Sequence, residues 1–374
     1  MVKSSKTSFL ARTRDRRIAA AVGLLVSIAV FSAGYFLERE DAFQSGLREL
    51  RLTHELRRTA VEDHFVSVAS DVLSLSRSPK VRDSFSSINA VWIKLGDYAS
   101  SVLRRGYLKK GEALSGIDLM GLQWELSNYR QPYEELELYS RTMVHYFDLH
   151  DIFLISADGD VMFTVAKEDD FGTNLVNGPY AKSALGFVFD RAMTTKGRVV
   201  TSYVERYEPS DGEPAMFAAA AIPDINGKTM GVFAAQLKLN SVDKILQAPD
   251  QVLEDLNIAV TNNDFLVLAG NLPKQSVDSL RTTYETESTR EGFAGFSGYN
   301  VIEDDDSGTR ISVFSPLVVG DRAWTIVSEV PLVQLIRRID HEMLVFIAVF
   351  AGLLAATISR VLIAAFRHEA PIVE

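Results

Sequence analysis

Two long apolar segments lie near the two ends of this 374-residue chain. The first, IAAAVGLLVSIAVFSAGYFL, covers residues 18–37, and the second, MLVFIAVFAGLLAATIS, covers residues 343–359 and continues past Arg360 to residue 366. Twenty helical residues are about 30 Å long, which matches the hydrocarbon core of a bilayer. We therefore predict transmembrane helices at 18–37 and 343–366, so that the chain between them is held at both ends.

The charges beside the first apolar segment predict its orientation. Residues 1–17 hold six basic residues and one acid, whereas residues 38–41 read ERED. Because basic residues favour the cytoplasmic side, residues 1–17 are expected to form a cytoplasmic tail. A cleaved signal peptide is the alternative, but the apolar core is long and no small-x-small cleavage site follows it. The second span then returns residues 367–374 to the cytoplasm, with Arg360 near that surface.

Residues 38–342 are consequently expected outside the cytoplasm. They hold 46 of the 49 acids and 31 of the 39 bases, which gives this segment a net charge of −15. Such an acidic surface argues against nucleic acid as a partner. The chain has no cysteine, which excludes disulfides, thiolate metal sites and a cysteine nucleophile.

The external segment is predicted to open with a long helix over residues 38–80. Apolar residues recur along it at heptad spacing, with a first group of Phe43, Leu47 and Leu50 and a second group of Val61, Phe65, Val68, Val72 and Leu75. Such a stripe suits either the seam of a parallel homodimer or packing on the chain's own sheet, and the sequence leaves both open. Ser78-Pro79 is expected to end the helix.

A first module is predicted over residues 81–245. It begins with helices, and YEELELYSRTMVHYFDL forms one of them. The stretch DIFLISADGDVMFTV then reads as a hairpin, since its Asp-Gly pair suits a tight turn. Strands are expected in five places and a helix at about 181–194, which together describe a five-stranded antiparallel sheet with helices on one side, a PAS-like α+β module. The five strands are 151–156, 161–166, 198–204, 215–222 and 230–239.

A second, shorter module is predicted over residues 246–330. Its strand-like segments repeat the order of the first module in reduced form, and they are NIAVTN, FLVLAG, GFSGYNVI, RISVFSPLV and WTIVSEV. Pro331 can then start an exit helix over residues 331–342 that runs into the second apolar segment.

This layout resembles the double Cache (dCache) sensor ectodomain of bacterial methyl-accepting chemotaxis proteins, sensor histidine kinases and membrane cyclases. The resemblance covers residues 38 to about 366 and implies an α+β fold, with a long N-terminal helix and two PAS-like antiparallel-sheet modules between two transmembrane helices. The stretches that carry it are DIFLISADGDVMFTVAKEDDFGTNL, GPY, GVFAAQL, GFSGYN and SPLVVGDRAWTIVSEVP.

The resemblance implies a transmembrane chemosensory receptor, or its sensor half, in a bacterial inner membrane with its main domain in the periplasm. A small ligand would bind in the membrane-distal module at 81–245, and the membrane-proximal module at 246–330 would pass the signal on. The alternatives are the sensor region of a histidine kinase or cyclase, and a non-sensing membrane protein that docks a periplasmic partner. The last residues, EAPIVE, resemble the start of a HAMP linker, so a cytoplasmic signalling module is expected if the chain continues.

The family's pocket lies between the sheet and the segment after its second strand. Amino-acid-binding members place an Arg and a Trp-Tyr pair in that segment and an Asp on the last strand. Here the segment reads KEDDFGTNLVNGPYAK, and Gln236 stands where the Asp would be. Because an amide cannot neutralise an ammonium group, a plain α-amino acid is not favoured as ligand.

The candidate ligand-binding residues are Lys167, Asn174, Tyr180, Lys182, Tyr203 and Gln236, with Glu205 and Tyr207 close by in sequence. Lysine and tyrosine side chains in one groove suit a carboxylate or another small anion. The alternative is that both lysines are solvated and that Tyr180 packs in the core.

The sequence contains no recognisable catalytic or metal-binding motif. It has neither a His-Glu-x-x-His pair nor a Gly-x-Ser-x-Gly elbow, and EDDDSG at 303–308 lacks the ligand spacing of an EF-hand loop. We therefore predict a protein that is not an enzyme, with no catalytic residue, metal or cofactor. Its expected partners are a small molecule, the lipid bilayer and a second copy of the chain.

Overall fold

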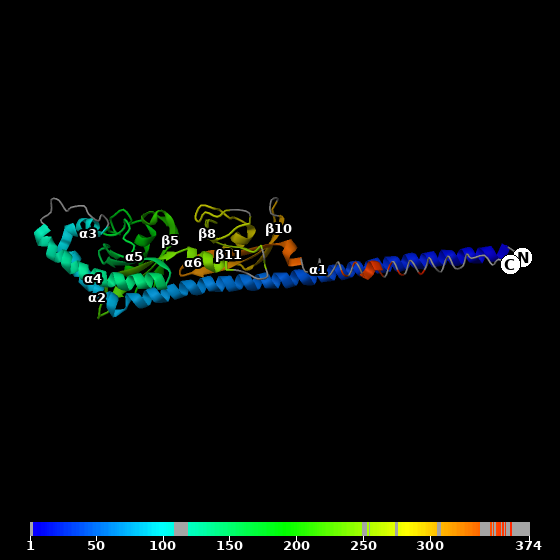
Figure 1. Cartoon of the computed structure of the whole chain (residues 1–374), viewed down its shortest axis with the longest axis horizontal. Helices are drawn as coiled ribbons and strands as arrows, with labels where there is room; N and C mark the ends of the chain where they lie inside the picture. Colours follow the sequence, from blue (N-terminus) through cyan, green and yellow to red (C-terminus); the bar gives the residue numbers. More distant parts are fainter. Residues whose placement is uncertain are drawn as a thin grey trace.

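Two modules, each built on a β-sheet, pack one after the other along the long helix α1, Lys3–Ser76 (Figure 1). The module of strands β1–β6 lies at the C-terminal end of α1, and we call it the distal module. The module of strands β7–β11 lies nearer the N-terminal end, and we call it the proximal module. The computed structural model describes the backbone of residues 3–107, 119–248, 253, 255–273, 276–304 and 308–336, and of single residues between 345 and 360.

The predicted break after the first helix is confirmed. Helix α1 ends at Ser76, and α2, Pro79–Leu95, begins directly with the proline. The Ser78 hydroxyl accepts a hydrogen bond from the backbone N–H of Val81 at 3.2 Å and so caps the new helix. The distal module continues with a short 3₁₀ turn, Gly96–Tyr98, and with α3, Ala99–Tyr107, and α4, Leu119–Tyr146.

The apolar stripe of α1 packs against the chain's own sheets. All five residues from Val61 to Leu75 in the stripe are buried in a core cluster that contains strands of both modules. Further toward the N-terminus, Leu47 and Leu50 are buried against β10 and β11 of the proximal module. Of the two alternatives for this stripe, packing on the own sheet is therefore the one observed, and the homodimer stays a prediction.

The distal sheet has six strands, one more than expected. They are all antiparallel, in the order β2-β1-β6-β5-β3, and β4 also pairs with β5. The predicted strand at 198–204 is shortened to β3, and the extra strand is β4, which follows it and also pairs with β5. The six strands are β1 Leu149–Ser156, β2 Val161–Thr164, β3 Val200–Thr201, β4 Glu205–Tyr207, β5 Glu213–Pro223 and β6 Thr229–Lys238.

Helices cover both faces of the distal sheet, so the expectation of helices on one side was wrong. Helix α5, Ala184–Thr194, packs on one face, where Phe153 and Ile155 of β1 belong to its core cluster. Helices α1, α2 and α4 pack on the other face, where Ile152 and Leu154 are buried. Successive side chains of β1 point to opposite faces of the sheet, and both faces are buried. The sequence of the strand is therefore an unbroken apolar run. We call the first of these faces the α5 face.

Tyrosines from α4 cover the edge of the distal sheet at β2. The hydroxyl of Tyr129 donates to the carbonyl of Met162 at 2.6 Å, and that of Tyr133 donates to the carbonyl of Thr164 at 2.8 Å. These bonds satisfy backbone groups that an edge strand would otherwise leave open. The strand ends earlier than predicted because the next two backbone N–H groups, of Val165 and Ala166, donate to the carboxylate of Asp151 instead.

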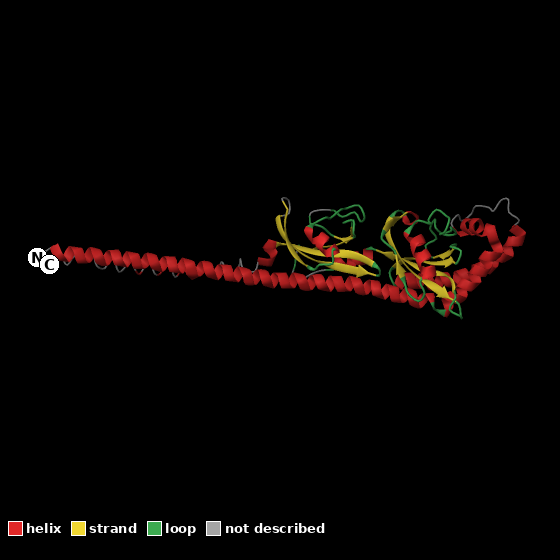
Figure 2. Ribbon diagram, turned by 180° about the vertical axis from the view of Figure 1, so that it is seen from behind, coloured by secondary structure: helices red, strands yellow, loops and turns green. Residues whose placement is uncertain are grey.

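The proximal module is a second, five-stranded antiparallel sheet that follows the first along α1 (Figure 2). Its strand order is β8-β7-β11-β10-β9, and all five predicted strands are confirmed. Two short helices, α6 Asn240–Leu246 between the modules and α7 Glu287–Phe293 on the sheet, were not predicted. The strands are β7 Asn257–Thr261, β8 Val267–Gly270, β9 Gly298–Asp304, β10 Gly308–Val319 and β11 Arg322–Pro331.

The two modules are joined by side-chain contacts as well as by α1. Arg206 on β4 donates to the carboxylate of Asp278 and, at 2.9 Å, to the carbonyl of Ser279 in the proximal module. On the α1 side, the ring of Phe65 meets that of Trp324 edge-on at 5.6 Å. The strand that carries Arg206 therefore links the α5 face of one module to the other module.

The two predicted transmembrane segments are described only in part. Residues 18–37 belong to the backbone of α1, whereas of 343–366 only residues 345, 347, 349–352, 354, 356 and 360 are described. Within the described part of the chain, no helix combines the length and apolar character needed to cross a bilayer.

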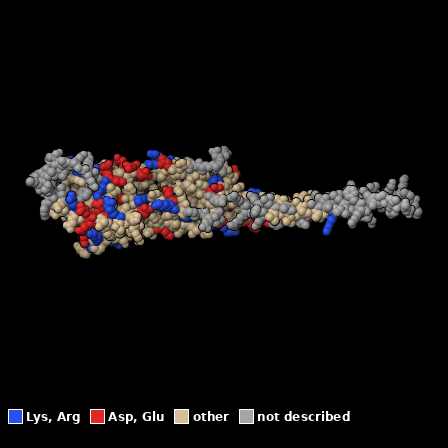
Figure 3. Space-filling view, viewed as in Figure 1, with Lys and Arg blue, Asp and Glu red and all other residues tan. Residues whose placement is uncertain are grey.

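On the face of the two modules in Figure 3, acidic and basic side chains are interspersed, so the negative charge is not gathered into one patch there.

Candidate functional site

A cluster of polar side chains is buried on the α5 face of the distal sheet. Asp151 of β1 lies directly opposite Gln236 of β6 in the sheet register. Asp170 comes from the segment after β2, and Tyr207 comes from β4. All four side chains are almost completely buried, and we call them the distal polar cluster. Burial of so many polar groups in an apolar core is costly unless each finds a partner.

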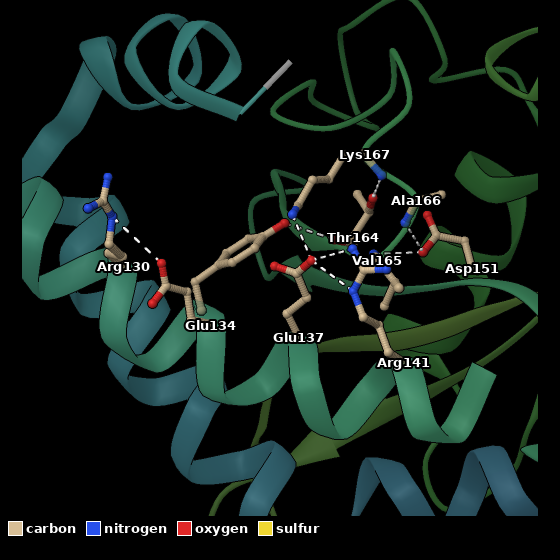
Figure 4. A network of polar contacts seen from close by, with 10 residues as sticks. Arg130, Glu134, Glu137, Arg141, Asp151, Thr164, Val165, Ala166 and Lys167 are labelled. Atoms are coloured by element: carbon tan, nitrogen blue, oxygen red, sulfur yellow. Dashed lines mark hydrogen bonds and ion pairs between the residues drawn. The ribbon is translucent and has the colours of Figure 1, made fainter. Parts of the chain in front are cut away.

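Backbone N–H groups bond to only one oxygen of the Asp151 carboxylate. Its Oδ1 accepts hydrogen bonds from Ile152 and Val165 at 2.7 Å and from Ala166 at 2.9 Å (Figure 4). Its Oδ2 is buried and meets no hydrogen-bond donor within the described part of the chain. Burial raises the pKa of Asp151 to about 7, although these backbone N–H groups and the hydroxyl of Thr164 act in the opposite direction.

The two carboxylate oxygens of Asp170 also differ in their hydrogen bonds. Its Oδ2 accepts the hydroxyl of Tyr207 at 2.7 Å, and its Oδ1 is buried with no donor from any described residue. Burial, together with the negative charge of Asp151, raises the pKa of Asp170 to about 8. The charge of Asp151 therefore acts on Asp170 inside the same apolar surroundings.

Gln236, opposite Asp151 in the sheet, begins a chain of hydrogen bonds. Its Nε2 donates to Ser210 Oγ at 2.9 Å, and that hydroxyl donates to Glu168 Oε2 at 2.6 Å. Glu168 Oε1 in turn lies 2.8 Å from His150 Nε2. The Gln236 Oε1 atom is buried, and none of the described side chains or backbone groups donates to it.

The cluster thus contains three buried oxygen atoms, Asp151 Oδ2, Asp170 Oδ1 and Gln236 Oε1, that no described group of the protein satisfies. We call them the open acceptors. Buried acceptors in native proteins are nearly always paired, so such atoms call for an explanation outside the chain. Their chemistry suits a ligand or solvent group that donates hydrogen bonds.

Aromatic rings and small side chains surround the cluster. The ring of Tyr207 lies 4.9 Å from that of Phe217 and 6.1 Å from that of Tyr180. Alanines at positions 219 and 234 face each other across β5 and β6 on the same side of the sheet. Aromatic walls with a few convergent polar groups are typical of small-molecule sites.

A pocket of about 400 Å³ lies next to the cluster, where the distal module meets the proximal one. Gln236 belongs to its lining and so adjoins both the pocket and Asp151. Charged residues around the pocket are His150, Glu213, Lys238 and Asp243, and Leu268 and Ser279 contribute from the proximal side. The pocket is large enough to hold a small metabolite beside the cluster.

Lys167, one of the six predicted ligand residues, is engaged by helix α4. Its Nζ donates to Glu137 at 2.8 Å, and Arg141 donates to the same carboxylate at 2.6 Å (Figure 4). The ammonium group also lies 5.4 Å from the centre of the Tyr133 ring. Its positive charge is therefore directed at α4, away from the open acceptors.

Three of the other predicted residues have mainly structural contacts. Asn174 Nδ2 donates to Asp160 Oδ1 at 2.8 Å and so ties the segment after β2 to the hairpin turn. Tyr203 donates to the carbonyl of Lys182 at 3.4 Å, while the Lys182 side chain is exposed. Of the six predicted residues, Gln236 belongs to the distal polar cluster, and Tyr180 lies next to it, with its ring 6.1 Å from that of Tyr207.

Sequence reasoning did not select Asp151 or Asp170. A weak signal existed in both cases, since Asp151 opens the otherwise apolar stretch DIFLIS and Asp170 ends the acidic run EDD. Each aspartate looks like an ordinary strand-end or loop acid until the fold buries it. The carboxylate-binding role of the two lysines stays a prediction.

The proximal module holds a second buried polar group, which is better satisfied. Glu329 accepts hydrogen bonds from Tyr284 at 2.8 Å and from Ser312 at 3.0 Å, and Arg310 lies 3.6 Å away. Across the described ranges of the chain, no three His, Cys, Asp or Glu side chains are grouped as a metal site would need. The distal polar cluster is therefore the stronger candidate site.

Comparison with known proteins finds similarity in structure only, because no protein-family model and no curated protein matches the sequence. The ligand-binding domain of the Campylobacter jejuni chemoreceptor Tlp3, solved with L-valine, is similar over 80% of this chain and 98% of that one, with a TM-score of 0.50 and 9% identity.

Two further solved structures are similar at lower scores. The ligand-binding domain of the Pseudomonas fluorescens chemoreceptor CtaA, in complex with L-serine, has a TM-score of 0.42 and 14% identity over 78% of this chain and 98% of that one. The sensor domain of the V. cholerae histidine kinase DctB has a TM-score of 0.38 and 13% identity over 67% and 93%. Taken with the two sheets along one helix, the match to Tlp3 means that this chain has the fold of a double Cache sensory ectodomain.

Proposed function

We propose that this protein is a transmembrane chemosensory receptor, or the sensor half of one, that binds a small extracellular ligand in its distal module. The observation that carries the proposal is the distal polar cluster, because it presents three open acceptors and aromatic walls beside a pocket of about 400 Å³. The fold supports the same role, since Tlp3 with this fold is a chemoreceptor solved with a bound amino acid.

The proposal includes a route for the signal. Strand β4 carries Tyr207, which bonds to Asp170, and Arg206, which bonds to the proximal module at Asp278 and Ser279. A ligand that moves Asp170 would therefore act on the contact between the modules. The proximal sheet packs on α1 and would pass the change to the segment after Pro331, toward the proposed second span at 343–366.

The proposal places the modules in the periplasm of a bacterium, with the spans at 18–37 and 343–366 in the inner membrane. The charge difference across the first span supports this orientation. A chemotaxis receptor and a histidine kinase both fit the fold, as Tlp3 and DctB illustrate.

Thermal unfolding of the full chain in detergent micelles tests ligand binding. We expect at least one compound from a panel of organic acids, amines, nucleobases and sugars to raise the melting temperature. A ligand that binds only the native state at 100 times its dissociation constant adds about 2.7 kcal/mol of stability, which is easily measured. A flat response to every class would contradict the proposal and favour the alternative of a module that docks a periplasmic protein.

A further inference from the structure

We propose that a phosphatidylethanolamine molecule of the periplasmic leaflet docks between α1 and the proximal module, with its phosphate on Arg39 and its ammonium group on Glu40. Both side chains line a pocket of about 340 Å³, which we call the interfacial pocket. The proposal goes beyond the sensory role of the distal module. It rests on one part of the proposed function, the placement of residues 18–37 in the inner membrane.

One face of α1 forms the first wall of the interfacial pocket. It contributes Phe36, Arg39, Glu40 and Phe43, whose spacing of three, one and three residues places them on the same side of the helix. Aliphatic side chains from β9, from β10 and from the residues after β11 form the other wall. The pocket is therefore apolar, with one basic and one acidic side chain next to each other on α1.

The position of the pocket along α1 matches the headgroup layer of a bilayer. The hydrocarbon core is about 30 Å thick and the whole bilayer about 40–45 Å, so each headgroup layer is about 5–7.5 Å deep. Helix α1 runs without a break from the predicted span into the proximal module (Figure 1). At about 1.5 Å per residue, Arg39 lies about 3 Å beyond Leu37, the last residue of the span, and Phe43 about 9 Å beyond it. With residues 18–37 in the membrane, Arg39 and Glu40 therefore lie among the lipid headgroups.

Arg39 and Glu40 both have bonding capacity left for a headgroup. The guanidinium of Arg39 makes no hydrogen bond or ion pair with any described residue. Glu40 Oε1 accepts Gln44 Nε2 at 2.9 Å, and no described group donates to Glu40 Oε2. A guanidinium binds phosphate oxygens through two parallel N–H bonds, and a carboxylate accepts the N–H groups of an ammonium. Phosphatidylethanolamine carries a phosphate and a primary ammonium on one short headgroup, which matches this pair of side chains.

Exposed apolar side chains in and beside the pocket suit the remainder of a lipid. Phe36 and Leu37 on α1 are 64% and 69% exposed, Val301 on β9 is 54% exposed, and Val333 after β11 is 67% exposed. Exposed apolar groups that lie together mark a contact with a membrane or with another protein. Here they continue the apolar segment 18–37, which favours a lipid as the occupant.

The charges at this end of α1 select among phospholipids. Residues 38–41, ERED, hold three acids and one base, a net charge of −2. Phosphatidylglycerol is anionic and has no cation for Glu40. The quaternary ammonium of phosphatidylcholine has no N–H group to donate. Phosphatidylethanolamine is thus the lipid whose headgroup complements both Arg39 and Glu40.

Native mass spectrometry of the full chain in detergent micelles tests the proposal by titration with three lipids. All three carry dioleoyl chains, and their headgroups are phosphatidylethanolamine, phosphatidylcholine and phosphatidylglycerol. We expect saturable binding of one phosphatidylethanolamine molecule. The other two lipids should bind at least about fivefold more weakly, because each lacks the N–H groups that Glu40 accepts.

Two substitutions separate the roles of the charged side chains. Arg39→Gln should weaken the binding of all three lipids at least about fivefold, because all three have a phosphate. Glu40→Gln should remove the preference for phosphatidylethanolamine over phosphatidylcholine and leave phosphatidylcholine binding unchanged. The matched controls are Glu38→Gln and Arg48→Gln. Glu38 and Arg48 are exposed on α1 and do not line the pocket, so both controls should bind the three lipids as wild type does.

The outcomes distinguish this proposal from the proposed function. Equal binding of the three lipids by wild type, or phosphatidylethanolamine binding that both pocket variants leave unchanged, would overturn the proposal. A dimer in the same spectra that Arg39→Gln abolishes would also overturn it, because the pocket would then belong to a contact with a second copy. In each of these cases the sensory role stands.

Flotation with dioleoylphosphatidylcholine vesicles tests the membrane placement separately. We expect the full chain to float with the vesicles. A chain that stays behind would overturn both the lipid site and the transmembrane part of the proposed function. The melting temperatures of the variants check their folding, and we expect them to equal that of wild type because the substituted side chains are exposed.

Discussion

Replacing Phe65 by alanine is expected to lower the free energy of unfolding by about 3–5 kcal/mol, the cost of deleting a buried phenylalanine. Phe65 is 6% exposed and belongs to the stripe of α1 that packs on both modules. Its ring meets Trp324 of the proximal module edge-on at 5.6 Å, in a geometry that adds about 0.5–1.5 kcal/mol beyond area burial. The substitution therefore leaves a cavity where α1 meets β11.

Urea unfolding of the full chain in detergent micelles measures this loss. Val66→Ala is the matched control, because Val66 is the next residue of the same helix and is 67% exposed. We expect the control to change the free energy of unfolding by no more than about 0.5 kcal/mol. Equal losses in the two variants would contradict the packing of this stripe against the chain's own sheets and would favour a stripe that is free to bind another chain.

The ligand-free protein is expected to lose stability as the pH rises from 6 to 8.5. Burial raises the pKa of Asp151 to about 7 and that of Asp170 to about 8, well above the value of 3.8 for an ordinary aspartate. In this pH range the folded chain therefore holds protons that the unfolded chain has already released. Stability must then fall with rising pH, by about 2–4 kcal/mol for the pair over this interval.

The double variant Asp151→Asn/Asp170→Asn isolates this effect. Its melting temperature should change much less than that of wild type between pH 6 and 8.5, and it should be the more stable protein at pH 8.5. His150 also lowers the stability as the pH rises over this range, because its bond to Glu168 raises its pKa. This effect is present in both proteins. His54, whose pKa burial lowers to about 4, acts in the opposite direction near pH 6, because its unfolded form still binds protons there, but it too is present in both proteins. Parallel curves for the two proteins would show that the aspartates are charged at neutral pH.

Local chemistry was enough to predict most of the secondary structure. The Asp-Gly pair places the hairpin turn, with Gly159 at a positive φ of 95°, and Ser78-Pro79 ends α1. Helix α7 escaped prediction because its capping box uses Thr289 where glutamate or glutamine is usual. The strand at 198–204 was placed as one piece because its sequence does not reveal that β5 pairs with two short partners.

The site was much harder to predict, because tertiary contacts decide it. Lys167 and Tyr203 have side chains that suit a ligand, but the fold directs them to Glu137 and to the carbonyl of Lys182. Glu137 lies on α4, 30 residues before Lys167, and nothing local couples the two. Conversely, Asp151 and Asp170 become unusual only when the fold buries them together. The heptad stripe of α1 was likewise compatible with a second chain or with the chain's own sheets, because only tertiary contacts decide which of them it packs against.

Hydrogen exchange along the full chain, with and without the compound that most raises its melting temperature, tests the location of the ligand site most directly. We predict slower exchange at β1, at residues 165–183 and at β4, because these segments carry Asp151, Asp170 and Tyr207. Protection confined to the proximal module, around Tyr284 and Glu329, would contradict a ligand site in the distal polar cluster.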